Sequence, residues 1–324
     1  MTLKIIGSQE DEFSLGPTEE GTYEEANGGT EMMRKELFSR VDEELLDKFQ
    51  IICSRVRWID PKKKTILWLH DTWDDPESQH LSEAERVKRF DRLVFVSNYQ
   101  MNTYNMAHGV PYQSSIVLQN AIEPIPAKEK KTDQVRLIYH TTPHRGLNIV
   151  VSAVRELAKI HGDYIHLDVF SSFEAYGWKD RDKEFEELFQ AIKDHPQMTY
   201  HGYQPNETVR AALQDAHVFT YPSVWPETSC IAAIEAMSAE CEVVCPNFAA
   251  LPETTANFAA MYQYSEDITN HANVFANVLN NTITNRFSDN TLRKLKFQKT
   301  YIDNFYNWDL RAAQWTGFLQ GLLA

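Results

Sequence analysis

The stretch HVFTYPSVWPETSCIAAIEAMSAECEVVC, from His217 to Cys245, contains the clearest indication of the fold class. It opens with a short run of apolar and β-branched residues, His217–Tyr221, and closes with a second such run, Glu242–Cys245. The longer segment between them, Ser229–Ala239, favours a helix. A strand, a helix and a strand in this order predict a βαβ unit whose two strands are parallel.

The same alternation continues towards both ends of the chain. Before this unit we expect strands at Val135–His140, Ile165–Phe170 and Met198–Tyr203, and helices at Leu147–Ile160, Lys183–Ile192 and Glu207–Gln214. In the first third we expect strands at Leu3–Ile6, Gln50–Cys53, Thr65–His70, Leu93–Ser97 and Ser115–Leu118, and helices at Thr30–Phe49 and Leu81–Phe90. The C-terminal residues favour helices, the last of them Trp308–Leu323.

A break separates two series of alternating elements at Glu123–Asp133, where EPIPAKEKKTD combines prolines with a run of charges. Such composition is typical of an exposed linker between domains. The helix after the break carries apolar residues at i, i+3, i+4 and i+7 from Leu147, which predicts one stripe lying on a sheet. We therefore predict two doubly wound α/β domains.

The composition narrows the classes of function. The chain has 324 residues, and its 32 Lys and Arg against 46 Asp and Glu give a formal net charge of −14. With 43% hydrophobic and 12% aromatic residues, the chain can build folded cores, which excludes disorder over most of its length. The acidic balance argues against nucleic acid as the main partner, whereas a small anionic ligand needs only a few local donors.

Targeting signals and cysteine spacing give two further expectations. The sequence contains no apolar run long enough to predict a membrane span, and its first residues do not resemble a secretion signal. We therefore expect a cytoplasmic protein. The cysteines form no Cys-x-x-Cys pair, so we expect buried, reduced thiols rather than a metal cluster at Cys53, Cys230, Cys241 and Cys245.

Ligands of doubly wound sheets bind beyond the carboxyl ends of the strands, so the strand-to-helix junctions are the first candidates. The backbone at Gly28-Gly29 can approach a ligand closely, although a flexible turn capped by Thr30 is an alternative. Arg145 stands at the entrance of a predicted helix, where a guanidinium can pair with a diphosphate. A solvated surface arginine is the alternative reading of that position.

Two carboxylates bracket the junction in the opening stretch. Glu227, in a proline-framed loop, can accept hydrogen bonds from sugar hydroxyls, and Glu235, inside the helix, can reach a ribose diol. The backbone N–H groups of Ser229–Ile231 can bind phosphate. The alternative is that the helix dipole alone favours Glu227 and that Glu235 is simply exposed. Glu235 lies in an apolar run, however, and should have a polar partner.

These segments resemble the retaining glycosyltransferases of family 4, which have the GT-B architecture of two facing Rossmann-like domains. Glu227 and Glu235 fit the E-x7-E motif of that family, and Arg145-Gly146-Leu147 resembles its basic-Gly-Leu step. Further matches are Asn27-Gly28-Gly29-Thr30-Glu31, Val117–Glu123, Pro222-Ser223, Leu251-Pro252-Glu253 and Tyr306-Asn307-Trp308 with Trp315. The resemblance implies an acceptor-side domain, residues 1–121 with 307–324, and a nucleotide-sugar domain, residues 122–306, with the last helix packed back on the first domain.

The resemblance also implies roles for single residues. His70, Arg145 and Glu227 would be catalytic, although a lone histidine at this place is more often a core or surface residue. The implied donor-binding residues are Gly28, Gly29, Thr30, His140, Tyr203, Ser229, Cys230, Ile231 and Glu235.

Three positions depart from the family. His140 stands where the family has an arginine, so we expect one diphosphate contact to be weaker, supplied elsewhere or dependent on pH. Thr228-Ser229-Cys230 replaces the common Gly-Phe-Gly after Glu227, and these side chains narrow the approach to the donor. Glu240 replaces a small glycine, which we expect to be a surface change.

The implied activity is transfer of a hexose from a nucleoside diphosphate sugar, of the UDP-glucose or GDP-mannose type, with retention at the anomeric carbon. The acceptor would be a hydroxyl of a saccharide or another molecule, selected by the loops Ser8–Ala26 and Trp58–Lys64. No metal is expected, since we interpret Asp180-Arg181-Asp182 as a solvated helix start and Asp74-Asp75 as a loop cap. A GT-B epimerase or phosphorylase and a sugar-nucleotide or carbohydrate-binding protein without turnover stay open as alternatives.

Overall fold

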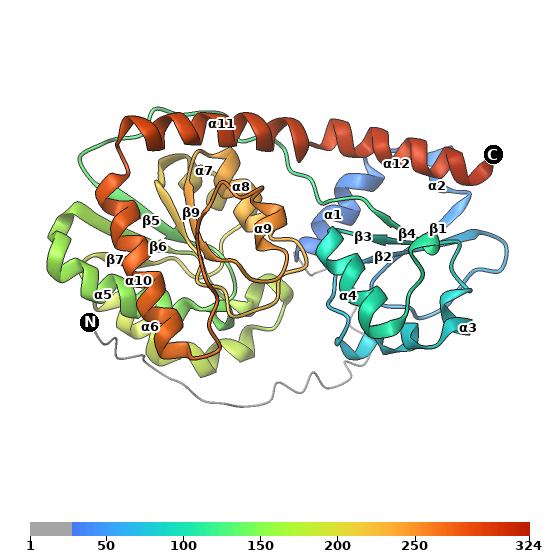
Figure 1. Ribbon diagram of the computed structural model, residues 1–324, viewed down its shortest axis with the longest axis horizontal. Helices are drawn as coiled ribbons and strands as arrows, with labels where there is room; N and C mark the ends of the chain where they lie inside the picture. The colour runs from blue at the N-terminus through green and yellow to red at the C-terminus, as the bar shows by residue number, and fades with distance from the viewer. Residues whose placement is uncertain (1–27) are drawn as a thin grey trace.

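The computed structural model describes residues 28–324, which form two parallel sheets flanked by helices (Figure 1). The smaller sheet has the order β1-β2-β3-β4, and the larger one β10-β9-β8-β5-β6-β7. Every paired strand runs parallel to its neighbour, with Ile51 opposite Ile66 in the smaller sheet and Leu137 opposite Leu167 in the larger. The prediction of two doubly wound α/β domains is confirmed, while the strand expected at Leu3–Ile6 lies outside the described residues.

The elements follow one another closely along the chain. The smaller domain contains α1 (Gly29–Phe38), α2 (Glu43–Leu46), β1 (Phe49–Cys53), β2 (Lys64–Leu69), α3 (Ala84–Val87), β3 (Arg92–Phe95), α4 (Asn98–His108) and β4 (Ser115–Val117). The larger contains β5 (Val135–Tyr139), α5 (Leu147–His161), β6 (Ile165–Val169), α6 (Glu186–Lys193), β7 (Met198–Tyr200), α7 (Asn206–Asp215), β8 (Val218–Thr220), α8 (Ile231–Ser238), β9 (Glu242–Pro246), α9 (Leu251–Thr254), β10 (Ala260–Tyr262) and α10 (Ile268–Asn285). The chain closes with α11 (Asp289–Phe305) and α12 (Trp308–Leu323).

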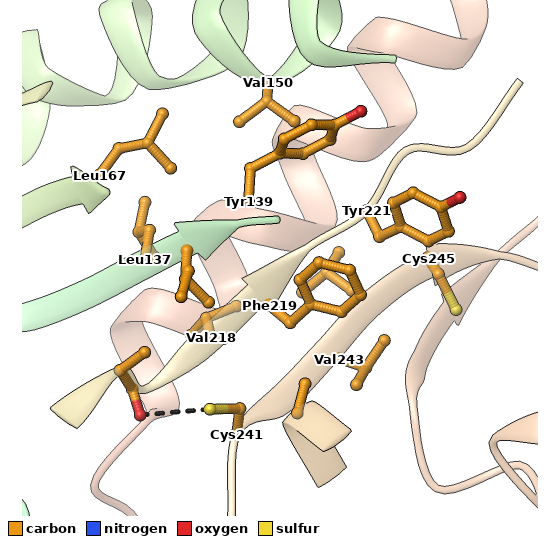
Figure 2. Packing of buried hydrophobic residues seen from close by; sticks show 14 of the residues in the cluster. Leu137, Tyr139, Val150, Leu167, Val218, Phe219, Tyr221, Cys241, Val243 and Cys245 are labelled. Atoms are coloured by element: carbon orange, nitrogen blue, oxygen red, sulfur yellow. Dashed lines mark hydrogen bonds between the residues drawn. The ribbon is translucent and has the colours of Figure 1, made fainter. Parts of the chain in front are cut away.

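The strands of the larger sheet are buried on both faces, which explains their nearly continuous apolar sequences. Figure 2 shows Val150 of α5 beside Tyr139 of β5, with Val218 and Phe219 of β8 in the same core. The strand order reverses where β5 lies between β6 and β8. In such sheets the crevice at the carboxyl ends of these strands is the usual ligand site.

The last helix returns to the smaller domain, as expected. Figure 1 shows α11 and α12 running one after the other along both domains. Trp308, Trp315 and Leu319 belong to the core that α1 and the smaller sheet form, and the Trp315 ring centroid lies 4.9 Å from that of Trp68. The two connections between the domains lie side by side, because the Ile122 N–H donates to the Tyr306 carbonyl at 2.7 Å.

The structure corrects several predicted bounds. The helix predicted at Thr30–Phe49 is two helices, because Asp42 accepts the Leu45 N–H at 3.0 Å and starts a new one. The strand predicted to Tyr203 ends at Tyr200, before a turn in which Gly202 has a φ of +66°. The helix predicted at Leu81–Phe90 is a 3-10 segment, Pro76–Ser82, followed by the single turn of α3. The sequence reasoning missed α4 and β10.

The four cysteines are free. Cys230, Cys241 and Cys245 are buried, as expected, whereas Cys53 is only partly buried. Burial raises the pKa of the Cys245 and Cys53 thiols to about 12, so both stay protonated. Among residues 28–324, no helix is long and apolar enough to cross a membrane.

Candidate active site

Arg145 and Glu227 form a buried ion pair beyond the carboxyl ends of β5 and β8. Arg145 Nη1 lies 2.6 Å from Glu227 Oε1, and the Tyr221 hydroxyl donates a hydrogen bond to the same oxygen. Burial is the largest single influence on the pKa of Arg145 and acts to lower it, but the Glu227 carboxylate and neighbouring groups together act in the opposite direction and hold this pKa well above its usual range. The site therefore contains a permanent positive charge with a carboxylate beside it.

Gly146 fixes the position of this arginine. Its φ of +114° is rarely accessible to residues with a side chain, and a Cβ there would lie 2.4 Å from the Pro222 carbonyl oxygen. The turn that carries Arg145 therefore packs directly against the backbone that leads to Glu227. The turn Arg145-Gly146-Leu147 and the segment that leads to Glu227 meet because no side chain separates them.

Glu235 has the partner that its apolar surroundings require. Its side chain is 4% exposed, Arg210 Nη1 lies 2.7 Å from Oε1, and Asn206 Nδ2 lies 3.2 Å from Oε2. Burial raises the pKa of the Glu235 carboxyl, while Arg210 and Asn206 act to lower it. The alternative that Glu235 is simply exposed is wrong.

The start of α8 lies between these two carboxylates. The helix begins at Ile231, two residues later than predicted, and its cap Cys230 makes no side-chain capping bond. Cys230 is buried and burial raises its pKa, so its neutral thiol leaves only the backbone of this residue to meet a ligand. The first N–H groups of a helix have no partner within the helix and favour an anion.

The glycine loop lies against the larger domain. Gly28 caps α1 and Gly29 begins it, so Thr30 lies inside the helix and the alternative of a Thr30 cap is wrong. A Cβ at Gly28 would lie 2.7 Å from the Tyr176 ring, and one at Gly29 would lie 3.1 Å from Ile231 Cδ1. Glycine at these positions permits close contact with the start of α8.

His70 follows β2 and reaches the same region. Its carbonyl accepts a hydrogen bond from Thr228 Oγ1 at 2.7 Å, which joins the two domains next to Glu227. Burial lowers the pKa of His70 to about 3, so the imidazole is neutral near pH 7. Its Nε2 is buried and has no hydrogen-bond partner within the described part of the chain, so it is an unsatisfied polar atom beside this region.

Two further residues that the resemblance implies for donor binding are His140 and Tyr203. The His140 ring packs on Phe219 with centroids 4.6 Å apart, and burial lowers its pKa to about 3. His140 is therefore uncharged near pH 7, which rules out a charge that changes with pH in that range. Tyr203 is partly buried in the loop after β7, and none of the contacts described above involves it.

Three residues near the site were missed by the sequence reasoning. Tyr176 covers Gly28, Arg210 pairs with Glu235, and Tyr221 binds Glu227. The sequence indicates no role for Tyr221, and the charge of Glu235 in its apolar run predicts a partner without identifying it. Tyr176 had no signal in the sequence.

Glu253 adds a second contact between the domains. Its carboxylate accepts hydrogen bonds from the Asn98 N–H at 2.9 Å, the Asn98 side-chain amide at 2.8 Å and the Tyr99 N–H at 3.0 Å. A residue of the larger domain thus caps the N-terminus of α4 in the smaller one, where a negative charge is favourable.

The aspartates considered for a metal have local partners. Asp182 accepts the Phe173 N–H at 2.8 Å, Asp180 pairs with Lys183 at 3.0 Å, and Asp75 accepts the Glu77 N–H at 2.8 Å. Asp75 thereby caps a 3-10 segment, as expected of a loop cap. Across residues 28–324, no group of three or more His, Cys, Asp or Glu side chains is arranged to hold a metal ion.

Comparison with known proteins agrees with this architecture. A glycosyltransferase from Rickettsia africae has a TM-score of 0.68 at 12% identity, over 94% of this chain and 84% of its own. Sucrose-phosphate synthase from Thermosynechococcus elongatus has a TM-score of 0.64 at 15% identity, over 81% and 68%. The Anabaena protein HepE, solved with UDP, has a TM-score of 0.63 at 12% identity, over 80% and 72%. No curated protein matches the chain in sequence.

The fold is therefore that of the GT-B glycosyltransferases, with two Rossmann-like domains. Residues 119–294, more than half of the chain, match the family described as glycosyl transferases group 1. The chain belongs to this family and is a glycosyltransferase.

Proposed function

We propose that this glycosyltransferase is a retaining enzyme of family 4 that moves a hexose from a nucleoside diphosphate sugar to an acceptor hydroxyl. The observation that carries the proposal is the meeting of distant segments around Glu227. Arg145 pairs with it, Thr228 beside it binds the carbonyl of His70, and Gly29 contacts Ile231 at the start of the next helix. The domain limits at residues 121 and 306 belong to the same proposal.

The leaving group of such a reaction is a nucleoside diphosphate, so catalysis depends on stabilising the negative charge that develops on it. The Arg145 guanidinium and the first N–H groups of α8 can supply this stabilisation, together with the backbone at Gly28 and Gly29. Their burial strengthens the interaction, because the surrounding dielectric is low. A neutral His140 contributes no charge, which makes Arg145 the main cation in the proposed site.

The sugar and the ribose would be held by the two carboxylates. Glu227, fixed by Arg145 and Tyr221, can accept hydrogen bonds from hydroxyls of the donor hexose. His70 would orient the same sugar through its unpaired, neutral ring nitrogen. Glu235 would accept the ribose hydroxyls. The donor is of the UDP-glucose or GDP-mannose type, and a structural neighbour solved with UDP makes UDP the first nucleotide to test.

Glu235→Ala is expected to weaken nucleotide binding, because it removes the acceptor for the ribose diol. Loss of hydrogen bonds to a charged group predicts a fall in affinity of about 10- to 100-fold. The measurement is calorimetric titration with UDP, GDP and ADP. Glu207→Ala, an exposed carboxylate in the first turn of α7, is the matched control and should bind as the wild type does. Unchanged affinity in Glu235→Ala would disprove the ribose assignment.

The proposed mechanism needs no metal ion, since Arg145 and backbone N–H groups can stabilise the diphosphate. Turnover of the preferred donor is therefore expected to survive dialysis against a strong chelator, within about twofold of the untreated rate. The rate of nucleoside diphosphate release, with and without added Mg²⁺ or Mn²⁺, measures this. Activity that disappears with the chelator and returns with a divalent cation would contradict the metal-free mechanism.

A further inference from the structure

Arg210 lies at the centre of a polar chain that begins at the proposed ribose site. Its Nη1 binds Glu235 Oε1 at 2.7 Å, and its Nη2 donates to the Glu123 carbonyl at 2.6 Å. Glu235 is held by α8, whereas Glu123 belongs to the segment that joins the two sheets. One guanidinium therefore bonds to both the carboxylate and the connection between the domains.

The chain of contacts continues into the smaller domain. The side chain of Glu123 forms an ion pair with Arg40, which follows α1, and Arg40 also pairs with Glu36 within that helix. The Glu123 carboxylate is more than half exposed, so this outer pair alone contributes little to stability. The inner pair differs, because the Glu235 and Arg210 side chains are only 4% and 21% exposed.

We propose that Arg210 is a positioning residue that holds Glu235 ionised and oriented for the ribose hydroxyls, and that it ties this site to the segment between the domains. The proposal rests on the proposed function, because it takes Glu235 as the ribose acceptor. It adds a residue on another helix, α7, that acts through this carboxylate, and it predicts a preference for ribonucleotides over 2′-deoxyribonucleotides.

The geometry requires an arginine in particular. A guanidinium presents its N–H groups in a rigid fork, so one arm can bind the carboxylate while another binds a backbone carbonyl. A lysine at this position would keep the charge without the fork. A carboxylate has about four acceptor positions, so the bonds from Arg210 and Asn206 leave acceptor capacity for a diol.

Removal of Arg210 changes the pKa of Glu235 as well as its orientation. Burial raises the pKa of Glu235, and Arg210 is the larger of the two influences that oppose this. Without the guanidinium that pKa rises further, so the carboxyl takes up a proton at a higher pH than in the wild type. Nucleotide binding that needs the carboxylate is then lost at a higher pH as the solution is acidified.

The test compares Arg210→Met and Arg210→Lys with the wild type, using Arg155→Met on the exposed face of α5 as control. Affinity for UDP, GDP and ADP is measured from about pH 6 to about pH 9, and the best binder is then compared with its 2′-deoxy form. For Arg210→Met we expect nucleotide binding about tenfold weaker than in the wild type near pH 7, and a larger loss of affinity at lower pH. The variant should bind the ribonucleotide and its 2′-deoxy form with similar affinity. Arg210→Lys should recover part of the affinity and the pH profile, and Arg155→Met should match the wild type.

The possible results distinguish a failure of the role of Arg210 from a failure of the proposed function. If Glu235→Ala weakens binding while Arg210→Met keeps the wild-type pH profile and ribose preference, the inference about Arg210 is wrong and the ribose role of Glu235 stands. If Glu235→Ala also leaves binding unchanged, or no nucleotide binds the wild type, the proposed site itself is wrong. Should Arg210→Met fail to fold, the pH profile and the ribose preference of Arg210→Lys decide the question, with wild-type values in both counting against the inference.

Discussion

Arg145→Met is expected to lower turnover by about 100- to 1000-fold, the usual effect of removing one donor that stabilises charge in a transition state. The guanidinium is mostly buried, charged and next to Glu227, and His140 is neutral and cannot replace it. The rate of nucleoside diphosphate release at saturating donor measures the effect. An unchanged rate would contradict the assignment of Arg145.

The same substitution also destabilises the fold, because it leaves Glu227 buried without its partner, at a cost of about 3 to 5 kcal/mol. The double variant Arg145→Met/Glu227→Gln tests the cost in stability. Neutralising the carboxyl should restore much of the free energy of unfolding, measured by chemical denaturation, while turnover stays low because both proposed catalytic side chains are changed. Recovery of turnover together with stability would contradict the catalytic roles of both Arg145 and Glu227.

Gly146→Ala is expected to destabilise the protein by about 2 to 5 kcal/mol and to abolish most activity. The φ of +114° strains any residue with a Cβ, and the new methyl group would meet the Pro222 carbonyl at 2.4 Å. Backbone on both sides has to move, so Arg145 and the loop to Glu227 shift apart. Thermal and denaturant unfolding, together with donor turnover, measure the two consequences.

Gly109→Ala is the matched control for this prediction. Gly109 also has a positive φ, +68°, but a Cβ there meets nothing within 4 Å. Gly109→Ala should therefore lower the free energy of unfolding only by the cost of a Cβ at positive φ, about 1 to 2 kcal/mol, and leave activity unchanged. Equal destabilisation by the two substitutions would show that contact between the Arg145 turn and Pro222 has no special role.

The sequence predicted the elements whose signals are local. The helix Trp308–Leu323 has the predicted bounds, and α5 differs from the prediction by one residue at its end. Both have amphipathic or apolar patterns that a packed sheet or core selects. Predictions failed where a single side chain interrupts the pattern, as Asp42 does between α1 and α2. The helix α4 was missed because its sequence is polar, although Ser97 gives a local capping signal by accepting the Gln100 N–H at 3.0 Å.

The candidate site could be predicted only in part, because the sequence shows local patterns but not the contacts between distant segments. Glu227, Glu235 and Arg145 stand at strand-to-helix junctions, which the alternation of elements identifies. The residues that set their charge and orientation come from distant segments, as Arg210 does for Glu235. The low pKa of His140 depends on burial against Phe219, which no spacing in the sequence reveals.

If this chain uses the Arg145 and Glu227 site to cleave a nucleoside diphosphate sugar, the wild type should release nucleoside diphosphate continuously from at least one donor. The donors to compare are UDP-glucose, GDP-mannose and an ADP-sugar, with water or added saccharides as acceptor. The rate of release should be at least about 100-fold lower in Arg145→Met. A wild-type protein that binds a donor but releases no diphosphate with any acceptor would contradict this role of the site.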